Sequence, residues 1–252
     1  MLADTRYQII LETLRRQRSV TVQELADLLD TSVSTVRRDL ITLDSQGLLN
    51  KVHGGASLSE SQLSSAEPDM STKEGLNIAE KQAIGLAAAA MIRPDDFVFI
   101  DAGSTTLQLV NALDGEALRA VYVTNGLAHI RVLTQKGCTV YVPGGRIRQR
   151  TEAVVGAMAI NSLRQYNFTK AFLGVNGVSL LRGFTTPDVE ERELKATVLQ
   201  AAAECWFLAD HTKFERVYPA AICGIRSAFL LTNHLPNEEY RSLTTIKEAD
   251  KV

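Results

Sequence analysis

The sequence predicts two domains within 252 residues, a small one of three helices with a hairpin and a larger α/β one. In residues 1–57, three helical patterns follow one another closely and end at a turn with two adjacent glycines. In residues 76–252, short apolar runs alternate with amphipathic helices, which is typical of a sheet covered by helices on both faces. The serine-rich stretch 58–75 between them has the composition of a linker.

Three helices are predicted in the N-terminal part. Residues 4–17 carry apolar side chains at helical spacing, and residues 19–22 interrupt the pattern. Thr21 and Glu24 have the spacing of a capping box, which would start the second helix. A turn at Asp30 then leads into the third helix.

The third predicted helix, residues 31–40, has two chemically different sides. Branched aliphatic side chains share one stripe, namely Val33, Val36, Leu40 and Leu43. Hydroxyl and guanidinium groups lie on the opposite side or at its margin, namely Ser34, Thr35, Thr42, Arg37 and Arg38. Such groups can reach phosphates and base edges in the major groove of DNA. The alternative is an ordinary amphipathic helix with a solvated polar face.

Residues 47–56 read as a short strand, a glycine turn and the start of a return strand. Three helices followed by such a hairpin form a winged helix-turn-helix, in which the third helix enters the major groove. The hairpin, or wing, would then touch the DNA backbone. The predicted DNA contacts are Ser34, Thr35, Arg37 and Arg38 on the helix, with Lys51 and His53 on the wing.

The overall charge gives this interpretation little support. The net charge is −2, and residues 1–56 carry equal numbers of acidic and basic residues. DNA affinity would therefore depend on local basic clusters at 15–18, 37–38 and 51–53, which a dimer would double.

Composition places the chain among soluble, cytoplasmic proteins. Hydrophobic residues make up 45% of the chain and charged residues 22%, as in ordinary globular proteins. The longest apolar window, residues 84–92, is about half of a membrane span, and residues 1–6 do not resemble a signal peptide. Cys138, Cys205 and Cys223 are far apart in apolar contexts, which predicts reduced thiols and no metal site.

Polar clusters follow the strands predicted for the α/β part, at the sheet edge where such folds bind ligands. Residues 101–106 (DAGSTT) lie between the predicted strand 97–100 and a helix. The glycine lets the backbone approach closely, the helix N-terminus offers N–H groups, and three hydroxyls add donors. Together these features suit a phosphate. The alternative is a capped helix without a ligand.

Four further clusters follow other strands and would converge on the same edge. They are residues 124–126, 143–148, 174–177 and 210–214. Arg146, Arg148 or Lys213 could reach a bound anion from them. Lys195 lies one helical turn after Glu191, either as a simple ion pair or as part of the pocket wall. The convergence predicts a site for a small, polar, phosphorylated ligand.

Both parts of the chain resemble the DeoR/GlpR family of bacterial sugar-metabolism regulators. In the first part the matching motifs are residues 24–26, 35–40 and 52–56. In the second part they are Asn77, Glu80, Lys81, residues 101–106, Thr124, Asn125, Gly144, Gly145, Gly156 and residues 210–214. Two departures stand out: Thr212, where the family often has Ser, and a charged segment after Thr232 in place of the terminal hydrophobic strand common in relatives.

The resemblance implies an effector domain similar in fold to ribose-5-phosphate isomerase and glucosamine-6-phosphate deaminase. It implies a phosphate loop made of Asp101, Gly103, Ser104, Thr105 and Thr106. Further pocket residues would be Thr124, Asn125 and Lys213. The strand-end clusters and the helix that carries Glu191 add three predicted effector-binding residues, Gly145, Arg146 and Lys195.

These patterns predict a DNA-binding repressor of carbohydrate catabolism genes, controlled by a phosphorylated sugar and assembled as a dimer or tetramer. No catalytic residue, metal or cofactor is predicted. One alternative is a sugar-phosphate isomerase or deaminase with a vestigial DNA-binding head, in which Asp101, Glu191 or Asp210 would act as a general base. Another is a ligand-sensing module without DNA contact.

Overall fold

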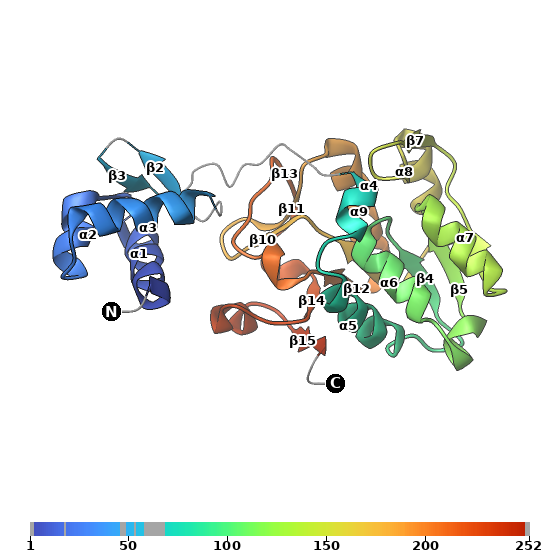
Figure 1. Cartoon of the computed structure of the whole chain (residues 1–252). Coiled ribbons are helices and arrows are strands. Elements are labelled where there is room, and N and C mark those ends of the chain that lie inside the picture. Colours follow the sequence, from blue (N-terminus) through green and yellow to red (C-terminus); the bar gives the residue numbers. More distant parts are fainter. Residues whose placement is uncertain (1–2, 18, 46–48, 53, 58–68, 250–252) are drawn as a thin grey trace. The chain divides into compact units, whose positions relative to one another are not determined.

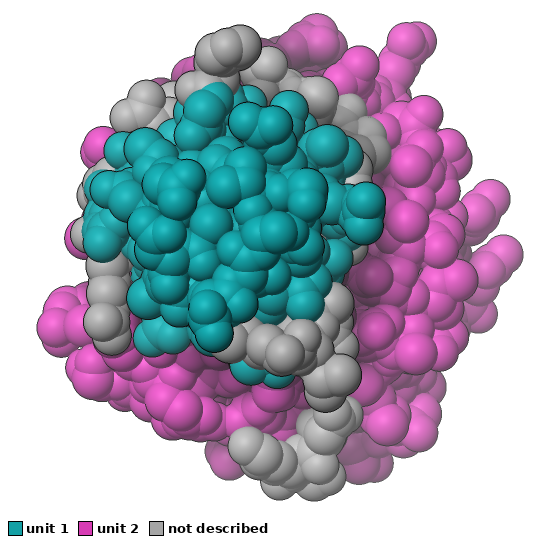
Figure 2. Space-filling model, turned by 60° about the vertical axis from the view of Figure 1, so that its left-hand side comes forward, with its two compact units in different colours: residues 1–63 teal, residues 64–252 magenta. Residues whose placement is uncertain are grey.

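The computed structural model describes residues 3–17, 19–45, 49–52, 54–57 and 69–249. The chain divides into two compact units, residues 1–63 and 64–252, coloured teal and magenta in Figure 2. Each unit buries a hydrophobic core of its own. Among the helices that the structure describes, none is long and apolar enough to span a membrane.

Unit 1 is a winged helix-turn-helix, which confirms the fold predicted for the N-terminal part (Figure 1). Its helices are α1 (Ala3–Gln17), α2 (Val22–Leu28) and α3 (Val33–Ser45). Its antiparallel sheet has the order β1 (Ser19–Thr21), β3 (Gly55–Ser57), β2 (Asn50–Val52). The predicted capping box is present: the Glu24 N–H donates to Thr21 Oγ1 at 3.2 Å, and the Thr21 N–H donates to the Glu24 carboxylate at 2.7 Å.

Helix α3 turns its aliphatic stripe toward the core of unit 1. Val36, Leu40 and Leu43 are at most 1% exposed and belong to one core cluster. Arg6 of α1 pairs with Asp39 of α3 through two hydrogen bonds, Nε to Oδ2 at 2.7 Å and Nη2 to Oδ1 at 3.0 Å. This ion pair fixes α3 against α1, so that one side of α3 stays outward.

Unit 2 is built on a seven-stranded sheet whose neighbouring strands are all parallel. In spatial order the strands are β15 (Ile246–Glu248), β14 (Phe229–Thr232), β12 (Ala202–Leu208), β9 (Phe168–Gly174), β4 (Phe97–Ile100), β5 (Val121–Thr124) and β6 (Thr139–Tyr141). One face is covered by α5 (Ile78–Ala89), α6 (Ser104–Ala112) and α7 (Leu127–Gln135). The other is covered by α8 (Ala157–Leu163) and α9 (Val189–Ala201). The predicted α/β fold is thereby confirmed.

Strand β4 shows how an unbroken apolar run fills both layers. Val98 and Ile100 enter the core beneath α5 and α6, while Phe99 enters the core beneath α8 and α9. None of the three side chains is exposed. Because side chains alternate across a strand, a strand between two helical layers has no polar face.

Two small antiparallel sheets complete unit 2. One pairs β7 (Arg146–Arg148) with β8 (Ala153–Val155). The other has the order β10 (Gly177–Ser179), β11 (Gly183–Thr186), β13 (Ala220–Cys223). Both lie in connections between strands of the main sheet, and neither was predicted as a separate sheet.

The charged C-terminal segment corrects one expectation, because it does form the last strand. β15 pairs in parallel with β14, with Ile246 opposite Leu230. Glu248 is 7% exposed, accepts a hydrogen bond from the Leu235 N–H at 3.2 Å and pairs with Arg241. A paired carboxylate therefore lets a charged segment close the sheet at its edge.

Candidate anion-binding site and DNA-binding face

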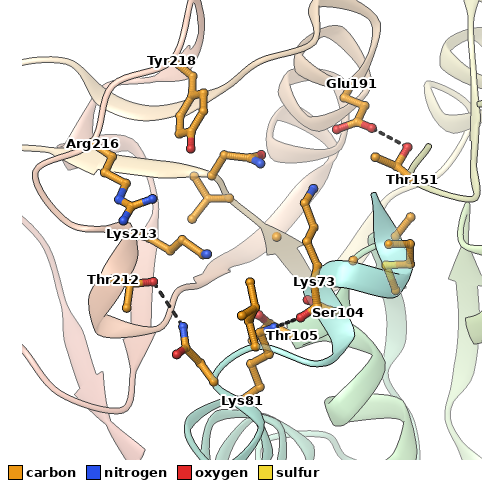
Figure 3. Close-up of a pocket in the computed structure, with 18 residues that line it drawn as sticks. Lys73, Lys81, Ser104, Thr105, Thr151, Glu191, Thr212, Lys213, Arg216 and Tyr218 are labelled. Carbon is orange, nitrogen blue, oxygen red and sulfur yellow. Dashed lines mark hydrogen bonds between the residues drawn. The ribbon is translucent and has the colours of Figure 1, made fainter. Parts of the chain in front are cut away.

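A cavity of about 280 Å³ opens in unit 2 at the carboxyl ends of β4, β9 and β12 (Figure 3). The short helix α4 (Met70–Glu74) forms another part of its wall. Open α/β sheets bind ligands at this edge, and the volume is close to the lower end of the range for small-molecule sites, ~300–1,000 Å³. The polar and charged lining residues include Lys73, Asn77, Lys81, Ser104, Thr105, Thr151, Asn176, Glu191, Thr212, Lys213, Arg216 and Tyr218.

The loop between β4 and α6 brings Gly103, Ser104 and Thr105 to the cavity. Gly103 holds the N-cap position of α6 and adds no side chain there. The N–H groups of the first helical turn therefore have no capping side chain at Gly103 and lie beside the cavity. Two hydroxyls at a helix N-terminus form a favourable anion site.

Four basic side chains line the cavity, against one carboxylate. The cations are Lys73, Lys81, Lys213 and Arg216. The carboxylate is that of Glu191, which already accepts hydrogen bonds from Arg148 at 2.8 Å and from Thr151 at 2.7 Å. The surplus of positive charge indicates an anionic ligand.

Burial and mutual repulsion act on two of these lysines. Burial lowers the pKa of Lys81, which is 3% exposed, and the nearby Lys213 ammonium lowers it further. Burial also lowers the pKa of Lys213, and the nearby Arg216 guanidinium lowers it further. The Asp210 carboxylate acts in the opposite direction and raises it. An anion placed among these ammonium groups stabilises their charged form, so anion binding and lysine protonation are linked.

Asp210 is an internal counter-ion of this cluster. It is fully buried, its Oδ1 accepts hydrogen bonds from the Thr212 N–H at 3.0 Å and from Asn77 Nδ2 at 3.3 Å, and its Oδ2 lies 3.6 Å from Lys213 Nζ. Burial raises the pKa of Asp210, but Lys213 and Thr212 outweigh burial and the pKa is lowered overall. The ionised carboxylate thus holds Lys213 beside the cavity.

Asp101 and Lys195, both predicted to bind the effector, lie behind the cavity lining. They form a buried ion pair, and Asp101 Oδ2 also accepts a hydrogen bond from the Gly174 N–H at 3.0 Å. The pair joins the ends of β4 and β9 to α9. In this position the two side chains hold the loop in place.

Three further predicted residues, Thr106, Thr124 and Asn125, also lie in this inner layer. Each is at most 2% exposed. Asn125 Oδ1 accepts a hydrogen bond from the Ala102 N–H at 2.8 Å, and Thr106 Oγ1 lies 3.0 Å from His129 Nε2. Burial lowers the pKa of His129 to about 3, so its ring is neutral at physiological pH. These contacts fix the loop through side chains that do not line the cavity.

Gly145 and Arg146 are not brought to the cavity. The Arg146 guanidinium is exposed and pairs with Glu190. At Gly145 an added Cβ would lie 2.7 Å from the Val155 carbonyl oxygen, so this position requires glycine for the close approach of β7 to β8. The hairpin geometry therefore directs Gly145 and Arg146 elsewhere, while Arg148 of the same cluster donates a hydrogen bond to the lining residue Glu191.

Sequence reasoning missed Lys73, Lys81, Arg216 and Tyr218 as lining residues. Lys73 lies within the stretch that was predicted to be a linker. Lys81 was noted only as part of a family motif, and Arg216 and Tyr218 follow the cluster 210–214 closely. Only Arg216 carried a usable signal, as a basic residue two positions after the predicted cluster 210–214. Lys73 and Lys81 are far along the chain from every predicted cluster.

The predicted DNA contacts of α3 lie on its outer side. Ser34, Arg37 and Arg38 are exposed, and Thr35 is half-buried. Ser32 Oγ lies 2.9 Å from Ser34 Oγ and 2.8 Å from Thr35 Oγ1, so the three hydroxyls form one cluster at the start of the helix. A row of hydroxyl and guanidinium groups is therefore available to a DNA groove.

On the wing, Lys51 is exposed on β2, and its N–H donates to Asp44 Oδ1 of α3 at 3.0 Å. The wing is thereby tied to α3. His53, the other predicted wing contact, lies outside the described residues.

A winged helix-turn-helix combined with an α/β unit that contains a cationic cavity defines a ligand-sensing transcriptional regulator. The family described as DeoR-like helix-turn-helix domain matches residues 6–62, and the one described as DeoR C terminal sensor domain matches residues 76–233. The chain belongs to the DeoR family, as its motifs implied.

Two relatives span almost the whole chain. The HTH-type transcriptional regulator FruR of Bacillus subtilis, described as uncharacterized, is 39% identical over 251 residues, 98% of each chain. The lactose phosphotransferase system repressor of Lactococcus lactis is 36% identical over 257 residues, 97% of this chain and 98% of that protein. Family and relatives identify a transcriptional regulator and not an enzyme, which removes the isomerase or deaminase alternative.

Among solved structures, ribose 5-phosphate isomerase A from Methanocaldococcus jannaschii matches 56% of this chain and 56% of its own, with a TM-score of 0.42 and 15% identity. The sorbitol operon regulator SorC from Klebsiella pneumoniae matches 83% of this chain and 90% of its own, with a TM-score of 0.40 and 11% identity.

Proposed function

We propose that this regulator represses carbohydrate catabolism genes and is controlled by a phosphorylated sugar that binds in the cavity of unit 2. The observation that carries the proposal is the meeting of a helix N-terminus, two hydroxyls and four basic side chains in one cavity. A phosphate monoester carries about −1.5 to −2 charges at pH 7, which suits this lining. The name of the Lactococcus lactis relative supports carbohydrate genes as the target.

In the proposed complex the phosphate accepts hydrogen bonds from Ser104, Thr105 and the first turn of α6, with Lys81 and Lys213 beside it. The sugar hydroxyls then face the neutral polar part of the lining, which includes Asn176. The buried pair of Asp101 and Lys195, together with Asn125 and Thr106, keeps the phosphate loop in position.

On the DNA side, we propose that Ser34, Thr35, Arg37 and Arg38 contact the operator in the major groove, with Lys51 and His53 at the backbone. The DNA-binding domain comprises residues 1–57 and the sensing domain residues 76–252. A cytoplasmic homo-oligomer, dimer or tetramer, would place two recognition helices on half-sites about 34 Å apart. The sugar phosphate controls operator affinity only if it prefers one arrangement of these helices over another.

A thermal-shift screen tests this function directly. Fructose 1-phosphate, fructose 6-phosphate, glucose 6-phosphate and ribose 5-phosphate are compared with the same sugars without phosphate. A ligand that binds only the folded protein, at about 100 times its Kd, adds about 2.7 kcal/mol of stability. In a domain of this size that corresponds to a rise in Tm of roughly 5–10 °C. Equal shifts with the unphosphorylated sugars, or none with any phosphate, would contradict the proposal.

Affinity for the sugar phosphate is expected to be greatest near neutral pH. Below about pH 6 the phosphate takes up its second proton and loses charge. The lysines are charged below their folded-state pKa values, which are lowered from 10.5 at Lys81 and Lys213, so their contribution is lost as pH rises through those values. Above its pKa, each lysine that loses its proton lowers the affinity for the sugar phosphate by up to about tenfold for every further pH unit.

Calorimetry of the same sugar phosphate across this pH range measures how affinity falls on the acid side and on the alkaline side of neutral pH, the acid and alkaline limbs of the profile. In Lys213→Gln the alkaline limb should become shallower than in the wild type, because one titrating ammonium is gone. A wild-type alkaline limb that begins only at the ordinary lysine value of 10.5 would contradict the assignment of these two lysines to the site.

A further inference from the structure

Residues 69–77 belong at once to the cavity wall and to the start of unit 2. Met70, Lys73, Leu76 and Asn77 line the cavity. α4 is the first helix of unit 2 that the structure describes, and along the chain residues 58–68 join it to β3 of unit 1. Figure 3 shows Lys73 among the side chains that line the cavity. A force exerted on this wall therefore acts on the segment that continues along the chain into the DNA-binding unit.

α4 has five residues, too few for a helix to be stable by its own hydrogen bonds. At its N-terminus the Asp69 carboxylate accepts a hydrogen bond from the Thr72 N–H at 2.8 Å. Met70 is 5% exposed, and its N–H donates to the Arg150 carbonyl at 2.9 Å. The position of α4 thus depends on a cap, one buried side chain and contacts with neighbouring loops.

The other end of α4 is held by a cavity residue. The Lys81 ammonium, from α5, donates to the carbonyl of Lys73 in the last turn of α4. Lys81 also lines the cavity beside Lys213. A phosphate bound in the cavity attracts the ammonium groups of both Lys81 and Lys73, and so it pulls on the contact between Lys81 and the Lys73 carbonyl. Occupancy of the cavity therefore changes the forces on α4.

Asn77 fastens the end of this segment to the opposite wall. Its φ is +52°, in the left-handed region, which asparagine adopts more readily than most residues that have a Cβ. Its Nδ2 donates to Asp210 Oδ1 and to Thr212 Oγ1, each at 3.3 Å. The last residue of the segment is therefore held by the same Asp210 and Thr212 that position Lys213 beside the cavity.

We infer that α4 is the element that passes effector binding to the DNA-binding unit, an inference that rests on the proposed control by a sugar phosphate. Without phosphate, Lys81 holds α4 through the Lys73 carbonyl. With phosphate bound, Lys81 and Lys73 turn to the anion and α4 takes a second docked position. A ligand can regulate DNA binding only if it binds one of two states of the protein more tightly than the other. The two docked positions of α4 are these two states. Asp69 is a positioning residue, because it caps α4 but does not line the cavity.

The test compares the full-length wild type with Asp69→Ala, which removes the cap of α4. The matched control is Asn237→Ala, which removes the side-chain cap of the short 3-10 helix Glu238–Ser242 in the same unit. The DNA is a duplex that the wild type selects from a random pool. The effector probe is whichever of the four sugar phosphates named above gives the largest thermal shift, and its Kd is measured by calorimetry.

The readout is the ratio of DNA Kd values with and without saturating sugar phosphate, measured by fluorescence anisotropy. We expect this ratio to lie about fivefold closer to 1 in Asp69→Ala than in the wild type. The Kd for the sugar phosphate should change by less than about threefold. Asn237→Ala should keep the wild-type ratio. Hydrogen exchange at residues 70–74 reports whether the cap of α4 has been lost.

An unchanged ratio in Asp69→Ala, with faster hydrogen exchange at residues 70–74, would overturn the role of α4 and leave the proposed function intact. A wild-type ratio of 1 with all four sugar phosphates is a different result. It would contradict the proposed function itself and the inference with it.

Discussion

Replacing Lys213 by Gln should weaken binding of the sugar phosphate by about 10- to 150-fold, because a hydrogen bond to a charged group contributes ~1.5–3 kcal/mol. Lys213 lines the cavity, and the buried Asp210 carboxylate lies 3.6 Å from its ammonium. The glutamine keeps a polar side chain of similar reach but loses the charge. DNA affinity without effector should remain at the wild-type value, because Lys213 lies in unit 2.

The matched control for this variant is Lys247→Gln. It removes the same charge from an exposed lysine of β15 that does not line the cavity. Calorimetry should give wild-type affinity for the sugar phosphate in the control and the large loss only in Lys213→Gln. Equal affinities in the two variants would remove Lys213 from the proposed phosphate site.

Replacing Arg38 by Ala should weaken operator binding by about 5- to 150-fold, since a good contact between arginine and a base is worth ~1–3 kcal/mol. Arg38 is exposed on the outer side of α3, while the buried face of the helix is held by Leu40 and by the ion pair of Asp39 with Arg6. The substitution therefore removes a DNA contact without disturbing the core. Affinity for the sugar phosphate should not change.

Anisotropy titrations at several salt concentrations decide what Arg38 contacts. Loss of a phosphate contact weakens all DNA sequences and makes the salt dependence shallower by about one unit, whereas loss of a base contact relaxes specificity at one position. Arg226→Ala, an exposed arginine in unit 2, is the control. If Arg38→Ala bound the operator as tightly as the wild type at fixed salt, the DNA-contacting face of α3 would be assigned incorrectly.

The parts of the molecule that could be predicted from the sequence are those set by local patterns. The stripe of Val36, Leu40 and Leu43 has the period of a helix with one buried face, and the structure buries these residues. The loop 101–106 combines a buried strand, a glycine and hydroxyls within a few residues. Its position at the start of a helix follows from that order alone.

The inner layer of the site could not be predicted in the same way. Asp101 and Lys195 are 94 residues apart and meet only because α9, which carries Lys195, packs against β9, the neighbour of β4 in the sheet. Strand order depends on the packing of the whole unit, which no local pattern encodes. The sequence therefore marked both residues as polar groups near the site without indicating that they pair behind it.

The wall formed by α4 was missed for a related reason. Its serine-rich surroundings have the composition of a linker, and five residues are too few to produce a recognisable helical period. Burial of Met70 and the contact of Lys81 with the Lys73 carbonyl hold the helix, and both are tertiary contacts. Arg146 is the opposite case, a residue that was predicted to bind the effector but does not line the cavity. Like Lys213 it follows a predicted strand, but it pairs with Glu190 outside the cavity.

The central claim is that a sugar phosphate in the cavity of unit 2 controls the DNA affinity of unit 1. Its most direct test is the anisotropy of wild type and Lys213→Gln on the selected duplex, at fixed salt, titrated with the sugar phosphate that gives the largest thermal shift. We predict a change in the DNA Kd of the wild type of at least about fivefold, and a response in Lys213→Gln that requires about 10- to 150-fold more sugar phosphate. A wild-type DNA Kd that stays constant while calorimetry shows the cavity to be saturated would contradict the claim.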